Sequence, residues 1–118
     1  MKANRVQRLA SGSVRAILLP MNQHDIIARL RENEAVLRER GVAHAALFGS
    51  RARGDDGPDS DIDIMIEIVP EAIEDVYSYV NLKSYIAALF SEPVDVVSRE
   101  FLKSAIRPLA EAEAVYAF

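Results

Sequence analysis

The spacing of apolar residues changes along this chain, and the changes predict its elements. From residue 22 to residue 41 apolar positions recur at helical spacing, with Asn22 as a capping residue and Gly41 as a stop. Shorter apolar runs bounded by turn residues predict strands. These strands cover residues 42–48, 61–68 and 93–97, and a last short strand covers residues 114–118.

Two further long helices complete the predicted set, at residues 71–90 and 101–112, with a short helical turn at residues 51–53. Pro108 lies near a helix start or a kink. The predicted apolar face of the second long helix runs through Ile73, Val76, Tyr77, Val80, Ser84 and Ala87. The order of elements indicates an α/β or α+β fold, a small mixed β-sheet flanked by helices that lie on one side of it.

The strand at residues 61–68 carries carboxylates where an apolar strand begins. Because side chains alternate between the faces of a strand, its four isoleucines share one face, whereas Asp61 and Asp63 lie on the other. Carboxylates roughly 7 Å apart repel each other unless positive charge lies between them. A pair of Mg²⁺ ions, which prefer hard oxygen ligands, would meet this need.

A third carboxylate, Asp95, stands between Val94 and Val96 in the strand at residues 93–97. If this strand pairs with the one before it, Asp95 joins Asp61 and Asp63 on one surface. An acid between valines of a buried strand is unfavourable unless it has a function. We therefore predict that these three aspartates bind metal and act in catalysis. An EF-hand is excluded, because no register places its glycine and its last glutamate correctly.

A glycine–serine turn, Gly49 and Ser50, directly follows the first strand. Glycine lets the backbone approach a ligand closely, and the start of a short helix favours phosphate oxygens. Arg51 or Arg53 would add a charged donor to the same phosphates, and the sequence does not distinguish between them. No Lys-Ser or Lys-Thr pair follows, so the turn is not a P-loop.

The spacing of these groups resembles a known superfamily. Ten residues separate Gly49-Ser50 from Asp61-Ile62-Asp63, as in the DNA polymerase β-like nucleotidyltransferases. "FGSRARG…SDIDIMI" with a later "VDVV" looks like the minimal nucleotidyltransferase (MNT) family, from about residue 24 to the C-terminus. The ending "EAVYAF" is also similar to the usual family ending. The first twenty residues lie outside the resemblance.

The resemblance implies a small mixed sheet that binds a nucleoside triphosphate and Mg²⁺. Gly49 and Ser50 would hold the β- and γ-phosphates, and Asp61 and Asp63 would coordinate two Mg²⁺ ions. Asp95 would ligate the catalytic ion and favour deprotonation of the incoming hydroxyl. Family members of this size are commonly antitoxins that transfer AMP from ATP to a tyrosine of a HEPN-domain RNase toxin. The cognate HEPN toxin and ATP are therefore the expected partner and substrate.

Composition limits the remaining possibilities. A chain of 118 residues suits one domain, and we expect an extension at residues 1–20 and the nucleotidyltransferase domain at residues 21–118. The net charge of −4 argues against broad nucleic-acid binding. The absence of cysteine excludes disulfides and thiolate zinc sites and fits a cytoplasmic protein. No apolar run is long enough for a membrane helix. A homo-oligomer is possible.

Two other functions remain open at this level. The chain could be a non-catalytic binding module that neutralises its partner by contact, although such a module has no need of three destabilising acids. It could also transfer a nucleotide to a small molecule such as an aminoglycoside, although a chain without a second domain makes this less favoured.

Overall fold

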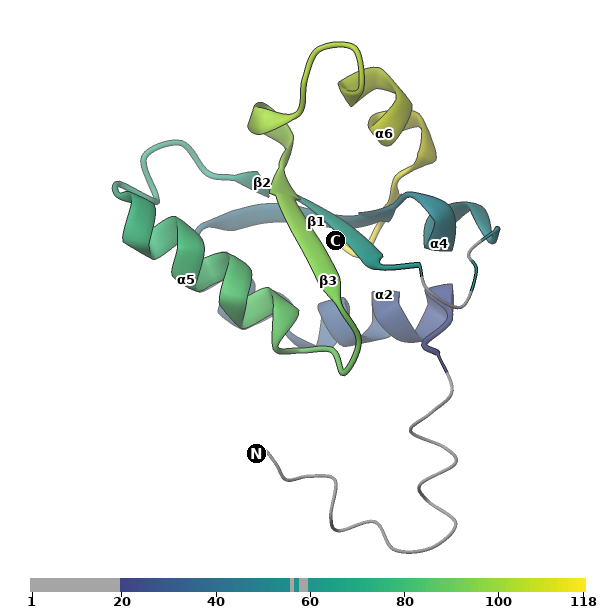
Figure 1. Ribbon diagram of the computed structural model, residues 1–118. Helices are drawn as coiled ribbons and strands as arrows, with labels where there is room; N and C mark the ends of the chain where they lie inside the picture. Colours follow the sequence, from purple (N-terminus) through teal and green to yellow (C-terminus); the bar gives the residue numbers. More distant parts are fainter. Residues whose placement is uncertain (1–19, 56, 58–59) are drawn as a thin grey trace, which may run out of the picture.

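A computed structural model describes residues 20–55, 57 and 60–118 (Figure 1). The predicted extension lies outside these residues apart from Pro20. Four strands form one sheet in the order β3-β2-β1-β4: β1 (Val42–Phe48), β2 (Ile62–Ile68), β3 (Val94–Ser98) and β4 (Val115–Tyr116). β1 runs antiparallel to β2 and β4, whereas β2 and β3 are parallel. The predicted small mixed sheet is thus confirmed.

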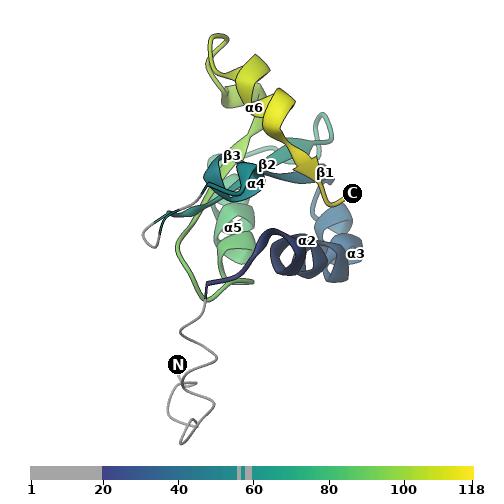
Figure 2. The same ribbon diagram turned by 90° about the vertical axis from the view of Figure 1, so that its right-hand side faces the viewer.

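The main core lies on the isoleucine face of β2. Ile62, Ile64 and Ile66 are completely buried there. They pack against α2 (Gln23–Glu32), α3 (Glu34–Glu39) and α5 (Val76–Ala87), which all cover the same face of the sheet (Figure 2). Each buried isoleucine removes enough apolar surface from water to contribute roughly 2 kcal/mol. The alternation predicted for this strand therefore determines which face of the sheet packs against these three helices.

The first predicted helix is interrupted, so residues 22–41 form two helices. Asn22 caps α2 as expected, because its side chain accepts a hydrogen bond of 2.9 Å from the Asp25 amide. Asn33 separates α2 from α3 and donates its side-chain amide to the Arg29 carbonyl at 2.8 Å. Asparagine competes in this way with helical hydrogen bonds. Gly41 ends the pair with a φ of +98°.

The second predicted helix begins too early and buries a different face. α5 starts at Val76, because Asp75 caps it by accepting a hydrogen bond of 2.7 Å from the Ser78 amide. Leu82 and Ile86 are the buried residues of α5, whereas Val76 is 72% exposed. Apolar side chains surround this helix, so periodicity alone did not select the buried face.

The helices do not all lie on one side, which corrects the predicted arrangement. A 3₁₀ turn, η2 (Arg99–Phe101), and a shorter α6 (Arg107–Glu113) replace the helix predicted at residues 101–112. α6 has Pro108 in its first turn and lies on the opposite face of the sheet (Figure 2). Ala110 there packs with Met65 and Ala46 in a second, smaller core. Met65 is consequently buried, although it shares a strand face with Asp63.

The turn after Gly49 and the character of the helices complete the description of the fold. The predicted turn after Gly49 is present as α4 (Ser50–Arg53), which follows β1 directly. In the described part of the chain, no helix has the length and apolar character needed to cross a membrane.

Candidate active site

The glycine–serine turn brings the chain from β1 into α4. Gly49 has a φ of +78°, a conformation that side chains other than glycine rarely adopt. Its carbonyl accepts hydrogen bonds of 3.1 Å from the amides of Ala52 and Arg53, while the Ser50 carbonyl accepts one of 2.9 Å from Gly54. These bonds close the turn and place the backbone of Gly49 beside β2.

Gly49 lies directly against the Asp63 side chain. A Cβ atom added to Gly49 would lie 2.4 Å from an Oδ atom of Asp63, far closer than atoms can approach without a shift. Only glycine therefore allows the turn and this carboxylate to occupy their observed positions. The structure thus brings together Gly49 and Asp63, which the sequence predicted to cooperate across ten intervening residues.

Asp63 and Asp95 occupy neighbouring positions on paired strands. In the parallel ladder of β2 and β3, Asp63 pairs with Asp95, so the two side chains leave the same face of the sheet. Phe48 of β1 pairs with Asp63 on its other side. Asp61 precedes β2 and is exposed. The predicted alignment on one face is present for Asp63 and Asp95, whereas for Asp61 it stays a prediction.

The burial predicted for Asp95 is wrong. β3 is an edge strand, and Asp95 is exposed, although it stands between two valines as the sequence suggested. An exposed carboxylate at a sheet edge has little desolvation cost. The argument from a buried, unfavourable acid therefore applies to Asp63, which is half-buried, and not to Asp95.

The repulsion among the three aspartates affects the pKa of Asp63. Burial raises the pKa of its carboxyl above the ordinary value of 3.8, and the negative charges of Asp95 and Asp61 raise it further. Arg53 and Arg51 act in the opposite direction and do not cancel this rise. A cation placed among these carboxylates would relieve the repulsion.

The residues fit hard metal ions in chemistry but do not form a closed site. Within residues 20–55, 57 and 60–118, no three acidic or histidine side chains converge to hold a metal ion. Asp63 and Asp95 supply adjacent oxygen donors of the kind that Mg²⁺ prefers. Asp61 can add a third donor, since its charge already acts on Asp63. The metal-binding roles of all three stay predictions.

The structure separates the two arginines that the sequence left equivalent. Residues two apart on a helix point in different directions. Arg51 turns inward and is only 3% exposed. Its guanidinium donates to the carbonyls of Met21 and Ser60 and to the Glu92 carboxylate, at 3.1, 2.6 and 2.7 Å. Arg51 therefore ties the loop before β2 to α2, a structural position that does not match its predicted phosphate contact.

Arg53 lies on the same side as the carboxylates. Its side chain is 45% exposed and forms ion pairs of 3.0 Å with Asp55 and 2.8 Å with Glu113. Its charge also lowers the pKa of Asp63. Of the two arginines, Arg53 has the position expected for a phosphate ligand.

Sequence reasoning missed two acidic residues of this region, Glu92 and Glu113. Burial alone would raise the pKa of Glu92, but hydrogen bonds from Arg51 and the Met21 amide lower it. Glu113 of α6 reaches Arg53 of α4. Each acid stands at least 40 residues from its arginine along the chain. No local pattern could have revealed either pair.

We expect Gly49→Ala to abolish ATP binding, because the new Cβ must displace the Asp63 carboxylate. Gly54→Ala is the matched control. Its φ of +82° is also positive, but its left-handed conformation (ψ 16°) costs alanine about 1 kcal/mol, less than the conformation of Gly49 (ψ −157°), and nothing lies within 4 Å of its added Cβ. Calorimetric titration with ATP and Mg²⁺ measures the affinity, and thermal melts measure stability. Equal ATP affinity in the two variants would contradict the assigned contact.

Replacement of the two arginines should affect different properties: stability for Arg51 and ATP binding for Arg53. Arg51→Met removes the ion-pair partner of Glu92, which keeps the hydrogen bond from the Met21 amide, and should lower the free energy of unfolding by about 3 kcal/mol. Arg53→Met should leave the free energy of unfolding almost unchanged, because its ion pairs are exposed, while weakening ATP binding. Urea unfolding and ATP titration measure these effects. Weaker ATP binding in a stably folded Arg51→Met protein would reverse the assignment.

The raised pKa of Asp63 predicts a pH-dependent gain from Asp63→Asn. Between the unfolded pKa near 3.8 and the higher folded pKa, the native state binds more protons, so wild-type stability falls as pH rises through this window. The Asp63→Asn variant has no carboxyl at this position, so its stability does not fall in this window. Its melting temperature should exceed that of the wild type at pH 7, and the difference should vanish below pH 3.8. Glu32→Gln, at an exposed acid of α2, should show no such gain.

Comparisons with known proteins identify the family and the fold of this chain. The profile of the nucleotidyltransferase domain family matches residues 30–117. The protein adenylyltransferase MntA of Thermococcus cleftensis is 37% identical over 93 residues, which are 78% of this chain and 92% of that protein.

Solved structures share the fold. A proposed minimal nucleotidyltransferase, 26% identical, superposes with a TM-score of 0.66 over 80% of this chain and 95% of its own. A toxin–antitoxin pair solved with AMP-PNP gives 0.58 at 22% identity, over 83% of this chain and 73% of that one. A Shewanella oneidensis complex of a tri-AMPylated HEPN toxin with an MNT antitoxin gives 0.53 at 20% identity, over 76% and 71%.

The predicted family and enzyme class are confirmed by these comparisons. The family profile extends over most of the chain, and the MntA relative is similar over almost its whole length. This chain belongs to the nucleotidyltransferase domain family.

Proposed function

We propose that this chain is an antitoxin that transfers AMP from ATP to a tyrosine hydroxyl of a cognate HEPN RNase toxin. The observation that carries the proposal is the seating of Gly49 against Asp63, which is itself paired with Asp95 across β2 and β3. This arrangement joins a phosphate-binding turn to a carboxylate face. The MntA relative supports a protein as the acceptor, and the solved toxin–antitoxin pairs support a HEPN partner and an adenine nucleotide.

Each residue has a distinct proposed part. Gly49 and Ser50 hold the β- and γ-phosphates, and Arg53 adds a positive charge beside them. Asp61, Asp63 and Asp95 would hold two Mg²⁺ ions, which when bound neutralise charge that develops on the triphosphate. Asp95 is exposed at the sheet edge and favours loss of the proton from the incoming hydroxyl. The attacking oxygen then bonds to the α-phosphorus, and pyrophosphate leaves.

The proposed domain comprises residues 21–118, with residues 1–20 as an extension, and a cytoplasmic location is proposed with it. We also propose that the chain does not bind nucleic acid directly. Every acidic residue follows position 20, whereas Lys2, Arg5, Arg8 and Arg15 precede it. The domain is therefore more acidic than the whole chain, which disfavours a phosphate backbone as partner.

The test mixes the chain with ATP, Mg²⁺ and the product of the adjacent gene and measures intact masses. We expect an AMP-sized increase on that product. Asp61→Asn/Asp63→Asn should reduce the transfer at least about a hundredfold, because the Mg²⁺ ions that would neutralise the phosphate charge lose two of their ligands. Glu32→Gln/Glu39→Gln removes two exposed acids of α2 and α3 and should leave the rate unchanged.

Other outcomes would contradict the proposal in distinct ways. A complex that forms equally with the aspartate variant, without any mass increase, would indicate neutralisation by contact. Transfer to an aminoglycoside in place of the protein would indicate a small-molecule enzyme. Peptide mapping of the modified product identifies the acceptor, and AMP on a residue other than tyrosine would refute that part of the proposal.

A further inference from the structure

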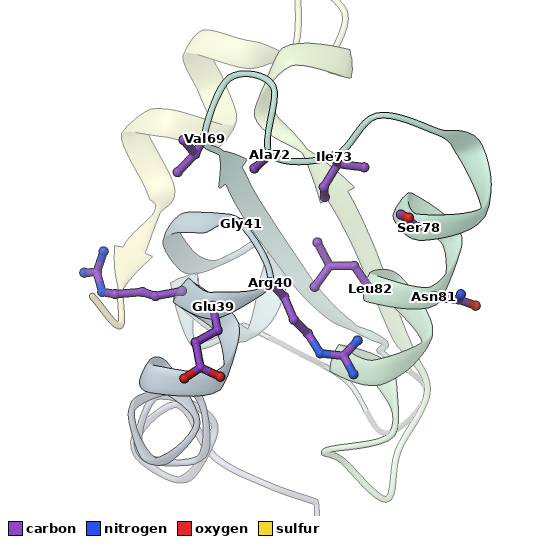
Figure 3. A pocket seen from close by; sticks show the side chains of 10 residues that line it. Glu39, Arg40, Gly41, Val69, Ala72, Ile73, Ser78, Asn81 and Leu82 are labelled. Carbon is purple, nitrogen blue, oxygen red and sulfur yellow. The ribbon is translucent and has the colours of Figure 1, made fainter.

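Two hollows lie at the end of β2 that is remote from the carboxylates, on either side of residues 69–75. Ile68 at this end lies five positions after Asp63, roughly 16 Å along the strand. Figure 3 shows the first hollow, of about 450 Å³, which Gly41, Ala72 and Leu82 help to line. The second hollow, of about 600 Å³, lies between the same segment, α5 and η2. Neither is lined by Asp61, Asp63 or Asp95.

The segment between the hollows is held firmly on the sheet. The Val69 amide donates a hydrogen bond of 2.8 Å to the Gly41 carbonyl. Ala72 packs so closely on Gly41 that an added Cβ there would lie only 2.8 Å from it. These contacts fix residues 69–72 against the end of the sheet, next to the larger hollow.

The larger hollow has an apolar wall that the fold leaves uncovered. Val76 is 72% exposed, Phe101 is 71% exposed and Val69 is 44% exposed, and all three line it. Tyr79 meets Phe101 edge to face, with ring centroids 5.6 Å apart, so the exposed ring is already oriented. A contiguous apolar surface of this kind is typical of an interaction site.

The rim of the same hollow is acidic. Glu71, Glu74, Asp75 and Glu100 line it, and none of the lysines, arginines or histidines in the described part of the chain does. Asp75 is occupied in capping α5, and Glu100 accepts a hydrogen bond from the Ser98 hydroxyl. Among the described residues, no ion pair or hydrogen bond involves the side chain of Glu71 or Glu74. These two carboxylates are available to a cationic partner.

The acidic rim indicates which kind of molecule would bind in this hollow. An acidic rim repels nucleotides and nucleic acids, and a second copy of this acidic domain would be repelled as well. A lysine or arginine beside an apolar side chain would satisfy both parts of the surface. We propose that this hollow, formed by residues 68–71, residues 73–76, Tyr79, Ser98, Glu100 and Phe101, docks a segment of a partner protein in which apolar side chains are flanked by lysine or arginine.

The test uses two helical peptides of about 18 residues with the same leucine face, one carrying lysine and the other glutamate elsewhere. Each is titrated into the isotopically labelled full chain, without nucleotide, and amide resonances are followed by NMR. We expect the leucine–lysine peptide to shift resonances of residues 68–76 and 98–101. Phe101→Ala should weaken its binding about tenfold, and Glu74→Lys about fivefold.

Glu32→Lys is the matched control, because it makes the same change of net charge at an exposed acid of α2. It should leave the affinity within about twofold. Shifts centred elsewhere, equal binding of the leucine–glutamate peptide, or equal weakening by Glu32→Lys would overturn the proposal. If the resonances of the larger hollow shift with protein concentration alone, the surface binds a second copy of the chain, and the proposal is overturned. Since no nucleotide is present, the result is independent of AMP transfer.

Discussion

The alternation of β2 is the constraint on which the rest of the structure depends. Ile62, Ile64 and Ile66 are completely buried on one face, so a slip of one residue would expose all three and bury Asp63. The strand is central and pairs on both sides, with β1 and with β3. The hydrophobic face therefore sets the register, and the register places Asp63 between Phe48 and Asp95.

The chemistry of the site is concentrated where that register meets the turn after β1. Gly49 packs on the Asp63 carboxylate, and burial with two neighbouring negative charges raises the pKa of that group. A folded domain retains such strain only because its core compensates for it elsewhere. A cation bound at this face would reduce the repulsion between the aspartates. The family membership of the chain and the proposed transfer of AMP both agree with it.

The two ends of β2 have different surfaces. Its beginning has carboxylates next to the turn at Gly49 and Ser50, with Arg53 held between Asp55 and Glu113. Its end opens into an apolar hollow, and on the rim lie Glu71 and Glu74, which form no ion pair within the part of the chain that the structure describes. A transferase that acts on a protein needs contacts beyond the reacting hydroxyl, because a single side chain supplies little specificity. The proposed docking surface and the proposed catalytic face are thus spatially separate and can be altered independently.

Local patterns in the sequence were sufficient for much of this picture. The strict alternation of β2, the caps at Asn22 and Gly41, and the spacing from Gly49 to Asp63 each depend on residues close together in the chain. Helix limits were less accurate. Asn33 interrupts the first helix, and Asp75 delays the start of α5, because side-chain caps compete with the apolar periodicity.

Only the tertiary structure decided which faces and charges were covered. α6 buries Met65 from the opposite side, and β3 at the edge leaves Asp95 exposed. Arg51 and Arg53 are equivalent in the sequence, yet one meets Glu92 and the other Glu113, partners far away along the chain. Burial and ion pairing of this kind arise from contacts between distant segments. The sequence by itself therefore determined the strand alternation and the motif, whereas packing decided the role available to each charged side chain.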